Sequence, residues 1–65
     1  MKLMYFKDTD TLYIEFREAT IAESKDLDEN TTLDVDADDN VCAITFEHAS
    51  ERTDVKRLTV EGIAA

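Results

Sequence analysis

Apolar and polar residues alternate along the first part of the chain. An apolar run, Leu3 to Phe6, is followed by the polar segment 7–10, and then by residues 11–17, where Leu12, Ile14 and Phe16 share one side. An apolar residue at every second position is the period of a half-buried β-strand. The pattern predicts a first β-hairpin with a short, Asp-containing loop.

A second alternating pair follows in the middle of the chain. Residues 32–36 alternate, residues 37–40 have turn composition, and residues 41–47 alternate again with Cys42, Ile44 and Phe46 on one side. This pattern predicts a second hairpin. Asn40 is expected to adopt the left-handed conformation that such a loop often requires, since Asn tolerates it best after Gly.

The remaining segments carry weaker patterns. Residues 20–24 read as a strand, residues 25–30 have loop composition, Ser50 is a candidate cap for a short helical turn, and residues 57–61 alternate as a last edge strand. The expected fold is mainly β (or small α+β), a single domain over residues 1–65. It is an antiparallel meander of about five to six strands, built from two hairpins, with one short helical turn near residues 49–55.

The length of the chain limits its core. A domain of 65 residues buries only about 60% of the surface that its unfolded chain exposes, so small domains often add disulfides, a structural metal or oligomerisation. The single cysteine, Cys42, excludes an internal disulfide, and Cys42 with His48 supplies too few soft ligands for zinc. We therefore expect the chain to stabilise its small core by oligomerisation.

The charge is strongly negative. Sixteen acidic residues against seven basic ones give a net charge of −9, which repels phosphate backbones and anionic lipids. We expect neither nucleic-acid nor membrane binding. No apolar run approaches the roughly 20 residues of a membrane helix, no signal peptide is recognisable, and one cysteine fits a reducing compartment, so the expected location is cytoplasmic.

The chain resembles the family called domain of unknown function 2283, a group of small bacterial and archaeal proteins. The resemblance covers roughly residues 1–50. It is carried by Met1-Lys2-Leu3-x-Tyr5, Asp8-x-Asp10-x-Leu12-Tyr13-Ile14, Glu23-Ser24, Leu33-Asp34-Val35-Asp36-x-Asp38-x-Asn40 and Phe46-Glu47-His48-Ala49-Ser50.

The resemblance implies a compact β-rich fold and an intracellular prokaryotic setting, and it supplies no catalytic or binding residues. Since some relatives are thought to lie beside small toxin-like proteins, it also implies a partner-binding role by association. Two positions depart from the family pattern. Asp39-Asn40 replaces a turn that commonly bears glycine, and His48 stands where Asp is common.

The acidic turn after the fourth predicted strand has two interpretations. Closely spaced carboxylates are the ligands that calcium prefers, which makes Asp34, Asp36, Asp38 and Asn40 candidate metal ligands. The spacing does not fit the EF-hand loop, because neither possible start places glycine at the sixth position. The other interpretation is a solvent-facing strand with its turn, and both remain open at this stage.

Catalysis is not expected. Cys42 and His48 are the candidate nucleophile and base, but six residues along a strand separate them by about 20 Å. Cys42 fits a core position, and a single glycine, Gly62, allows no glycine-rich phosphate loop. We expect no enzyme activity and no cofactor.

Apolar residues also fall on the second face of the predicted sheet. Met4, Phe6, Tyr13 and Val41 are the interface candidates, covered either by the helical turn and the C-terminal tail or by a second copy of the chain. The leading hypothesis is a non-catalytic interaction module, a homo-oligomer with an acidic rim for a basic, toxin-like protein partner. The alternative is a calcium-binding protein that uses the turn from Asp34 to Asn40.

Overall fold

The computed structural model describes residues 1–62, and residues 63–65 lie outside the described part. The chain forms one five-stranded sheet and one short helix. The elements are β1 (Lys2–Phe6), β2 (Thr11–Glu15), β3 (Glu23–Asp28), β4 (Thr31–Val35), β5 (Val41–Phe46) and α1 (Ala49–Arg52).

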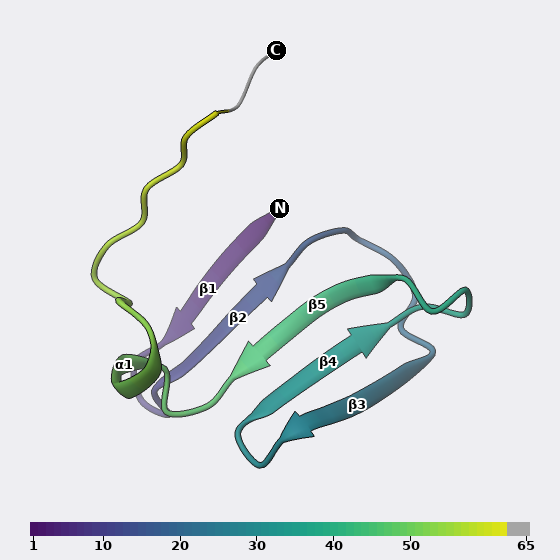
Figure 1. Cartoon of the computed structure of the whole chain (residues 1–65), viewed down its shortest axis with the longest axis horizontal. Helices are drawn as coiled ribbons and strands as arrows, with labels where there is room; N and C mark the ends of the chain where they lie inside the picture. Colours follow the sequence, from purple (N-terminus) through teal and green to yellow (C-terminus); the bar gives the residue numbers. More distant parts are fainter. Residues whose placement is uncertain (63–65) are drawn as a thin grey trace.

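All neighbouring strands are antiparallel, in the spatial order β1-β2-β5-β4-β3 (Figure 1). The last strand, β5, lies in the centre and pairs with both β2 and β4. The mainly β class and the short helix near residue 50 are confirmed. β1 and β3 are the two edge strands.

The two predicted hairpins are present. Leu3 pairs with Ile14 in the first, and Leu33 pairs with Ile44 in the second. The second contains a register shift between Asp34 and Val35, where one more residue lies on β5 than on β4. The left-handed residue of its turn is Asp39, with φ of 65°, so the prediction of Asn40 was wrong by one position.

The third strand, predicted over residues 20–24, begins at Glu23 and ends at Asp28, so residues 20–22 lie outside it. β3 pairs with β4, which follows it in the sequence, and the two strands form a third hairpin. Residues 25–28, predicted as loop, belong to β3. The reason is that β3 is an exposed edge strand, which needs no apolar alternation. Its polar side chains bond across the pair instead: the Ser24 hydroxyl donates to Asp34 at 2.6 Å, and the Thr32 hydroxyl donates to Asp26.

The C-terminal part corrects two predictions. Ser50 lies inside α1 and does not cap it; the residue before the helix is His48, which is left-handed with φ of 54°. Residues 57–61 form no strand, and Leu58 and Val60 are 67% and 63% exposed. Apolar and polar residues alternate here as in a strand, but within residues 1–62 this segment pairs with none of the five strands. Alternation without a pairing partner does not form a strand.

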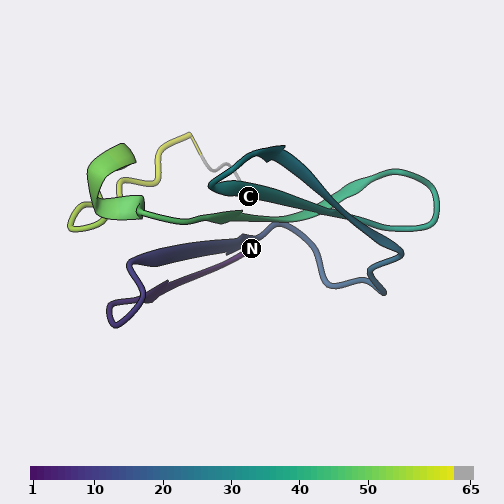
Figure 2. The same cartoon turned by 90° about the horizontal axis from the view of Figure 1, so that it is seen from below.

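The protein is one layer thick. In a view from the edge of the sheet, α1 lies on one side at one end, and within residues 1–62 no other helix or strand forms a second layer (Figure 2). The shortest dimension is 17 Å. The buried residues among those described are few: Thr31, Val35, Cys42, Ala43 and Ala49. A single sheet of this kind has no second layer against which to bury its apolar side chains.

Candidate interaction surface

The strand register aligns apolar residues in rows across the side of the sheet that carries α1. Directly paired residues point to the same face, so each row can be followed from β1 to β3. One row is Leu3, Ile14, Ile44, Leu33 and Lys25, and the next is Tyr5, Leu12, Phe46, Thr31 and Asp28. We call this the helix-side face. It is apolar over β1, β2 and β5, and charged only at β3.

The opposite face has a different composition. Its rows are Met4, Tyr13, Thr45, Thr32 and Asp26, and Lys2, Glu15, Ala43, Asp34 and Ser24. Apolar residues here are confined mainly to β1 and β2. From β5 to β3 this face carries the buried Ala43 and otherwise hydroxyl and carboxylate groups, which water can solvate.

Within residues 1–62, α1 covers part of the second row, with Arg52 over the Phe46 ring, and no other helix or strand lies over the apolar rows. Leu12, Ile14, Leu33, Ile44 and Phe46 are half-buried, and Leu3 is 41% exposed. The tail after α1 extends away from the sheet (Figure 1). The accessible surface is 5156 Å², whereas a compact monomer of 7.4 kDa has about 4,200 Å². The open sheet and the extended tail both contribute to this excess.

A polar cluster fixes α1 to the first hairpin. The Ser50 hydroxyl and the Ser50 N–H donate to the Asp10 carboxylate at 2.7 and 3.0 Å, the Tyr5 hydroxyl donates to the same group, and the Ala49 N–H donates to the Asp10 carbonyl at 2.9 Å. The bond from Tyr5, followed by the one from Ser50, holds the pKa of the Asp10 carboxyl below its ordinary value of 3.8. The same bond raises the pKa of Tyr5.

Arg52 ties the other side of α1 to the sheet. Its guanidinium lies 5.2 Å from the centre of the Phe46 ring and donates to the carbonyls of Asn30 and Glu47 at 2.7 and 3.0 Å. It also bonds the hydroxyl of the buried Thr31. Sequence reasoning missed the bonds from Ser50 to Asp10 and from Arg52 to Asn30 and Thr31, because each joins residues more than 20 positions apart.

Acidic side chains gather around β3 and the turns on either side of β4. The exposed members, which we call the acidic rim, are Glu23, Asp26, Asp28, Glu29, Asp38 and Asp39. Lys25 lies among them and pairs with Asp39 at 2.8 Å, which raises the pKa of Lys25. Such charge on an edge strand also opposes edge-to-edge aggregation.

Only two of the candidate metal ligands have side chains in contact: the Asn40 amide donates to the Asp36 carboxylate at 3.3 Å. Asp34 lies within β4 and accepts from Ser24, while Asp36 closes the turn by accepting from the N–H groups of Asp38 and Asn40, each at 2.9 Å. These bonds, that from the Asn40 N–H first, lower the pKa of Asp36. Within residues 1–62 no group of three or more His, Cys, Asp or Glu side chains is arranged to hold a metal ion.

Cys42 and His48 lie at opposite ends of β5. Cys42 is fully buried, as a core position requires, and its thiol donates weakly to the Asn40 carbonyl at 3.5 Å. His48 is exposed before α1, with its Nδ1 3.5 Å from Glu51. The strand between them prevents contact.

The sequence-derived interface candidates occupy the less apolar part of the molecule. Met4, Phe6 and Tyr13 lie on the opposite face, and Val41 lies at the register shift of β5. Phe6 and Val41 are exposed, whereas Met4 and Tyr13 are half-buried, and burial raises the pKa of Tyr13. The sequence pattern predicted that the apolar residues of the helix-side rows form an enclosed core, but in the structure they are half-buried or exposed.

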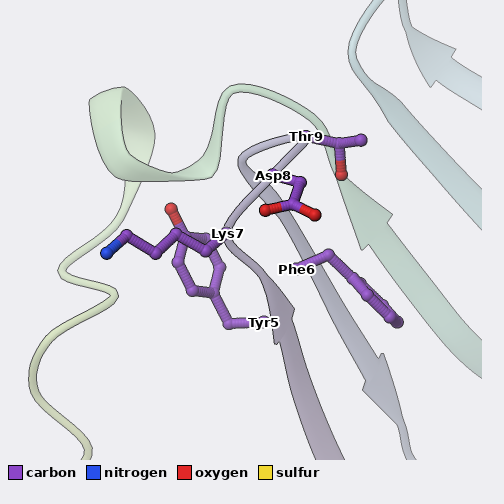
Figure 3. Close-up of a pocket in the computed structure, with 5 residues that line it drawn as sticks. All are labelled: Tyr5, Phe6, Lys7, Asp8 and Thr9. Atoms are coloured by element: carbon purple, nitrogen blue, oxygen red, sulfur yellow. The ribbon is translucent and has the colours of Figure 1, made fainter.

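The first hairpin turn also forms a hollow of about 410 Å³, lined by Tyr5, Phe6, Lys7, Asp8 and Thr9 (Figure 3). All five residues are consecutive, so one turn supplies every wall. Binding sites for small molecules normally enclose most of the ligand between several elements. This hollow therefore adds no ligand site to the sheet surface.

Comparison with known proteins places the chain in a family. No helix among residues 1–62 is long and apolar enough to cross a membrane. Neither the curated proteins nor the solved structures include a significant match. The family model described as "Protein of unknown function (DUF2283)" matches residues 2–50, a span that contains all five strands and the start of α1. The chain belongs to the DUF2283 family.

Proposed function

We propose that this protein is a small, non-catalytic interaction module that associates with itself and presents its acidic rim to a basic protein partner. The observation that carries the proposal is the open helix-side face, which has four aligned apolar residues across β1, β2, β5 and β4. An apolar surface of this kind on so small a chain is typical of an interaction site. The buried thiol of Cys42 and the exposed, Glu51-paired His48 offer no assembled catalytic group.

The acidic rim supports the second half of the proposal. It places six exposed carboxylates at and beside the edge of the sheet furthest from β1, where Asp39 pairs with Lys25 and Asp28 pairs with Arg52. A partner with a basic surface would be attracted over a distance of about 10 Å at moderate salt. Such complementarity mainly raises the association rate and the selectivity. A prokaryotic toxin-like protein would have the required chemistry, and a cytoplasmic location is consistent with the single reduced cysteine.

Partner capture with charge variants tests this half. The chain is immobilised, proteins are captured from the source cells at low salt, and elution is followed by mass spectrometry at rising salt. The variant Glu29→Gln/Asp38→Asn removes two rim charges whose side chains make no hydrogen bond or ion pair in the described structure. The control variant Asp8→Asn/Glu61→Gln removes two charges elsewhere on the surface.

We expect a basic protein that is released by salt, with binding weakened by the rim variant and retained by the control. If both variants capture the same protein equally well, the rim is not the recognition site. If no captured protein responds to salt, the proposal of a basic partner is wrong.

A further inference from the structure

We infer that two copies of this chain pack with their helix-side faces together, forming a two-layered sandwich. This inference rests on the proposed self-association and specifies its geometry. It differs from the two other possible arrangements, which are pairing of the free β1 edges into a wider sheet and contact through the opposite face.

Composition favours the helix-side face over the opposite face. On the central strand β5, Ile44 and Phe46 lie on the helix side, flanked by Ile14 and Leu12 of β2. On the opposite side, Thr45 lies between Tyr13 and Thr32. The core of a homodimer interface is apolar and poor in charge, and only the helix-side rows meet this condition across three adjacent strands.

The area fits a second copy. The chain exposes about 950 Å² more than a compact monomer of its mass; the open sheet supplies part of this excess and the extended tail supplies the rest, and a stable interface covers about 800 Å² on each partner. Stacked sheets lie about 10 Å apart, so a second sheet would supply the missing layer of this 17 Å thick molecule. The other available cover, the chain's own tail, leaves Leu58 and Val60 exposed.

The net charge of −9 on each copy opposes association only at long range, because the carboxylates lie outside the proposed contact. The acidic rim lies at β3 and at the turns, so the apolar rows of β1, β2 and β5 can meet while the carboxylates stay in water. The remaining repulsion between copies is long-range and is screened by salt. Added salt should therefore tighten the dimer, whereas it should weaken binding of a basic partner at the rim.

A matched pair of variants on β5 tests the geometry. Ile44→Glu introduces a carboxylate on the helix side, and Thr45→Glu introduces the same charge on the opposite side of the neighbouring position; both parent residues are half-buried. The mass is measured by sedimentation equilibrium and the fold by circular dichroism. We expect Ile44→Glu to raise the dimer dissociation constant by at least about 100-fold, and Thr45→Glu to change it by less than about tenfold.

A second pair of variants, on β1, tests the geometry if Ile44→Glu does not fold. Leu3→Glu and Phe6→Glu change two residues of β1 that are 41% and 48% exposed and that lie on the helix side and the opposite side, respectively. Disruption by Leu3→Glu alone supports the inference. If the parent chain is a dimer and the folded helix-side variants remain dimeric, the geometry is wrong while self-association stands. If the parent chain is a monomer at every concentration, both the geometry and the proposed self-association fail.

Discussion

The two faces of this sheet are built from the same strands but carry opposite chemistry. On the helix side, Leu3, Ile14, Ile44 and Leu33 are aligned across four strands. On the other side, the large apolar residues stop after β2, and β5 to β3 carry the small, buried Ala43 together with hydroxyl and carboxylate groups. Water can solvate the second face of a single sheet but not the first. This difference in composition is the basis of the proposal that a second copy covers the helix-side face while the opposite face stays in water.

The largest expected effect comes from shortening an apolar side chain on the helix side. Ile14→Ala should lower the free energy of unfolding by at least about 2 kcal/mol if a second copy buries this residue. Thr45→Ala, on the opposite face, should cost less than about 1 kcal/mol. Urea denaturation at one high protein concentration measures both. Equal costs would mean that the two faces are equally solvated.

A smaller effect is expected where α1 joins the sheet. Ser50→Ala removes the hydroxyl that donates to Asp10 across 40 residues of sequence and should cost about 1 kcal/mol. The matched change Ser24→Ala removes a hydrogen bond to Asp34 on the opposite face, between strands that the backbone already pairs. We expect Ser24→Ala to lower the free energy of unfolding by less than Ser50→Ala does. Thermal unfolding of both variants checks the order, and the reverse order would show that the Asp10 cluster does not anchor α1.

Acid should act through the carboxylates and leave the apolar rows unaffected. Asp10, Asp28 and Asp36 have pKa values held below 3.8, by hydrogen bonds from Tyr5, from the Asn30 N–H and from the Asn40 N–H, respectively. Their stabilisation is complete above the unfolded pKa and is lost as the pH falls through the lower folded values.

The free energy of unfolding should therefore decline between pH 4 and pH 2. Because a protonated carboxyl can still accept a hydrogen bond, each group should contribute less than deletion of the Ser50 hydroxyl. In Asp10→Asn the decline should be shallower, which a series of urea titrations against pH would detect. An unchanged slope would contradict the role of Asp10.

The smallest effect is expected from the tail. Ending the chain after Val55 removes Leu58 and Val60, which are well exposed and pair with no strand. Loss of such residues should change the free energy of unfolding by less than about 0.5 kcal/mol and leave the dimer intact. A dissociated or unfolded truncated chain would show that the tail covers the helix-side face in solution.

The sequence predicted the strands in which apolar and polar residues alternate. Both hairpins with apolar alternation were found, and so was the family. It did not predict β3 beyond Ser24, because Lys25 to Asp28 are held by polar cross-strand bonds on an exposed edge. It over-predicted residues 57–61, since their alternation has no pairing strand in the described structure.

The candidate site was located only in part. Alternation assigned Leu12, Ile14 and Phe16 to one face, but sequence alone could not show that no second layer covers that face, because layering depends on how distant segments pack. The interface prediction consequently fell on Met4, Phe6, Tyr13 and Val41. The bonds that join Asp10 to Ser50 and Arg52 to Asn30 and Thr31 left no local signal, since these partners are 40 and more than 20 residues away in sequence.

Sedimentation equilibrium of the unmodified chain, over a wide range of protein concentration and at two salt concentrations, tests the central claim most directly. A face-to-face dimer predicts a mass that rises from 7.4 kDa towards twice that value, with the midpoint at lower protein concentration in higher salt. A mass of 7.4 kDa under all conditions would contradict the account.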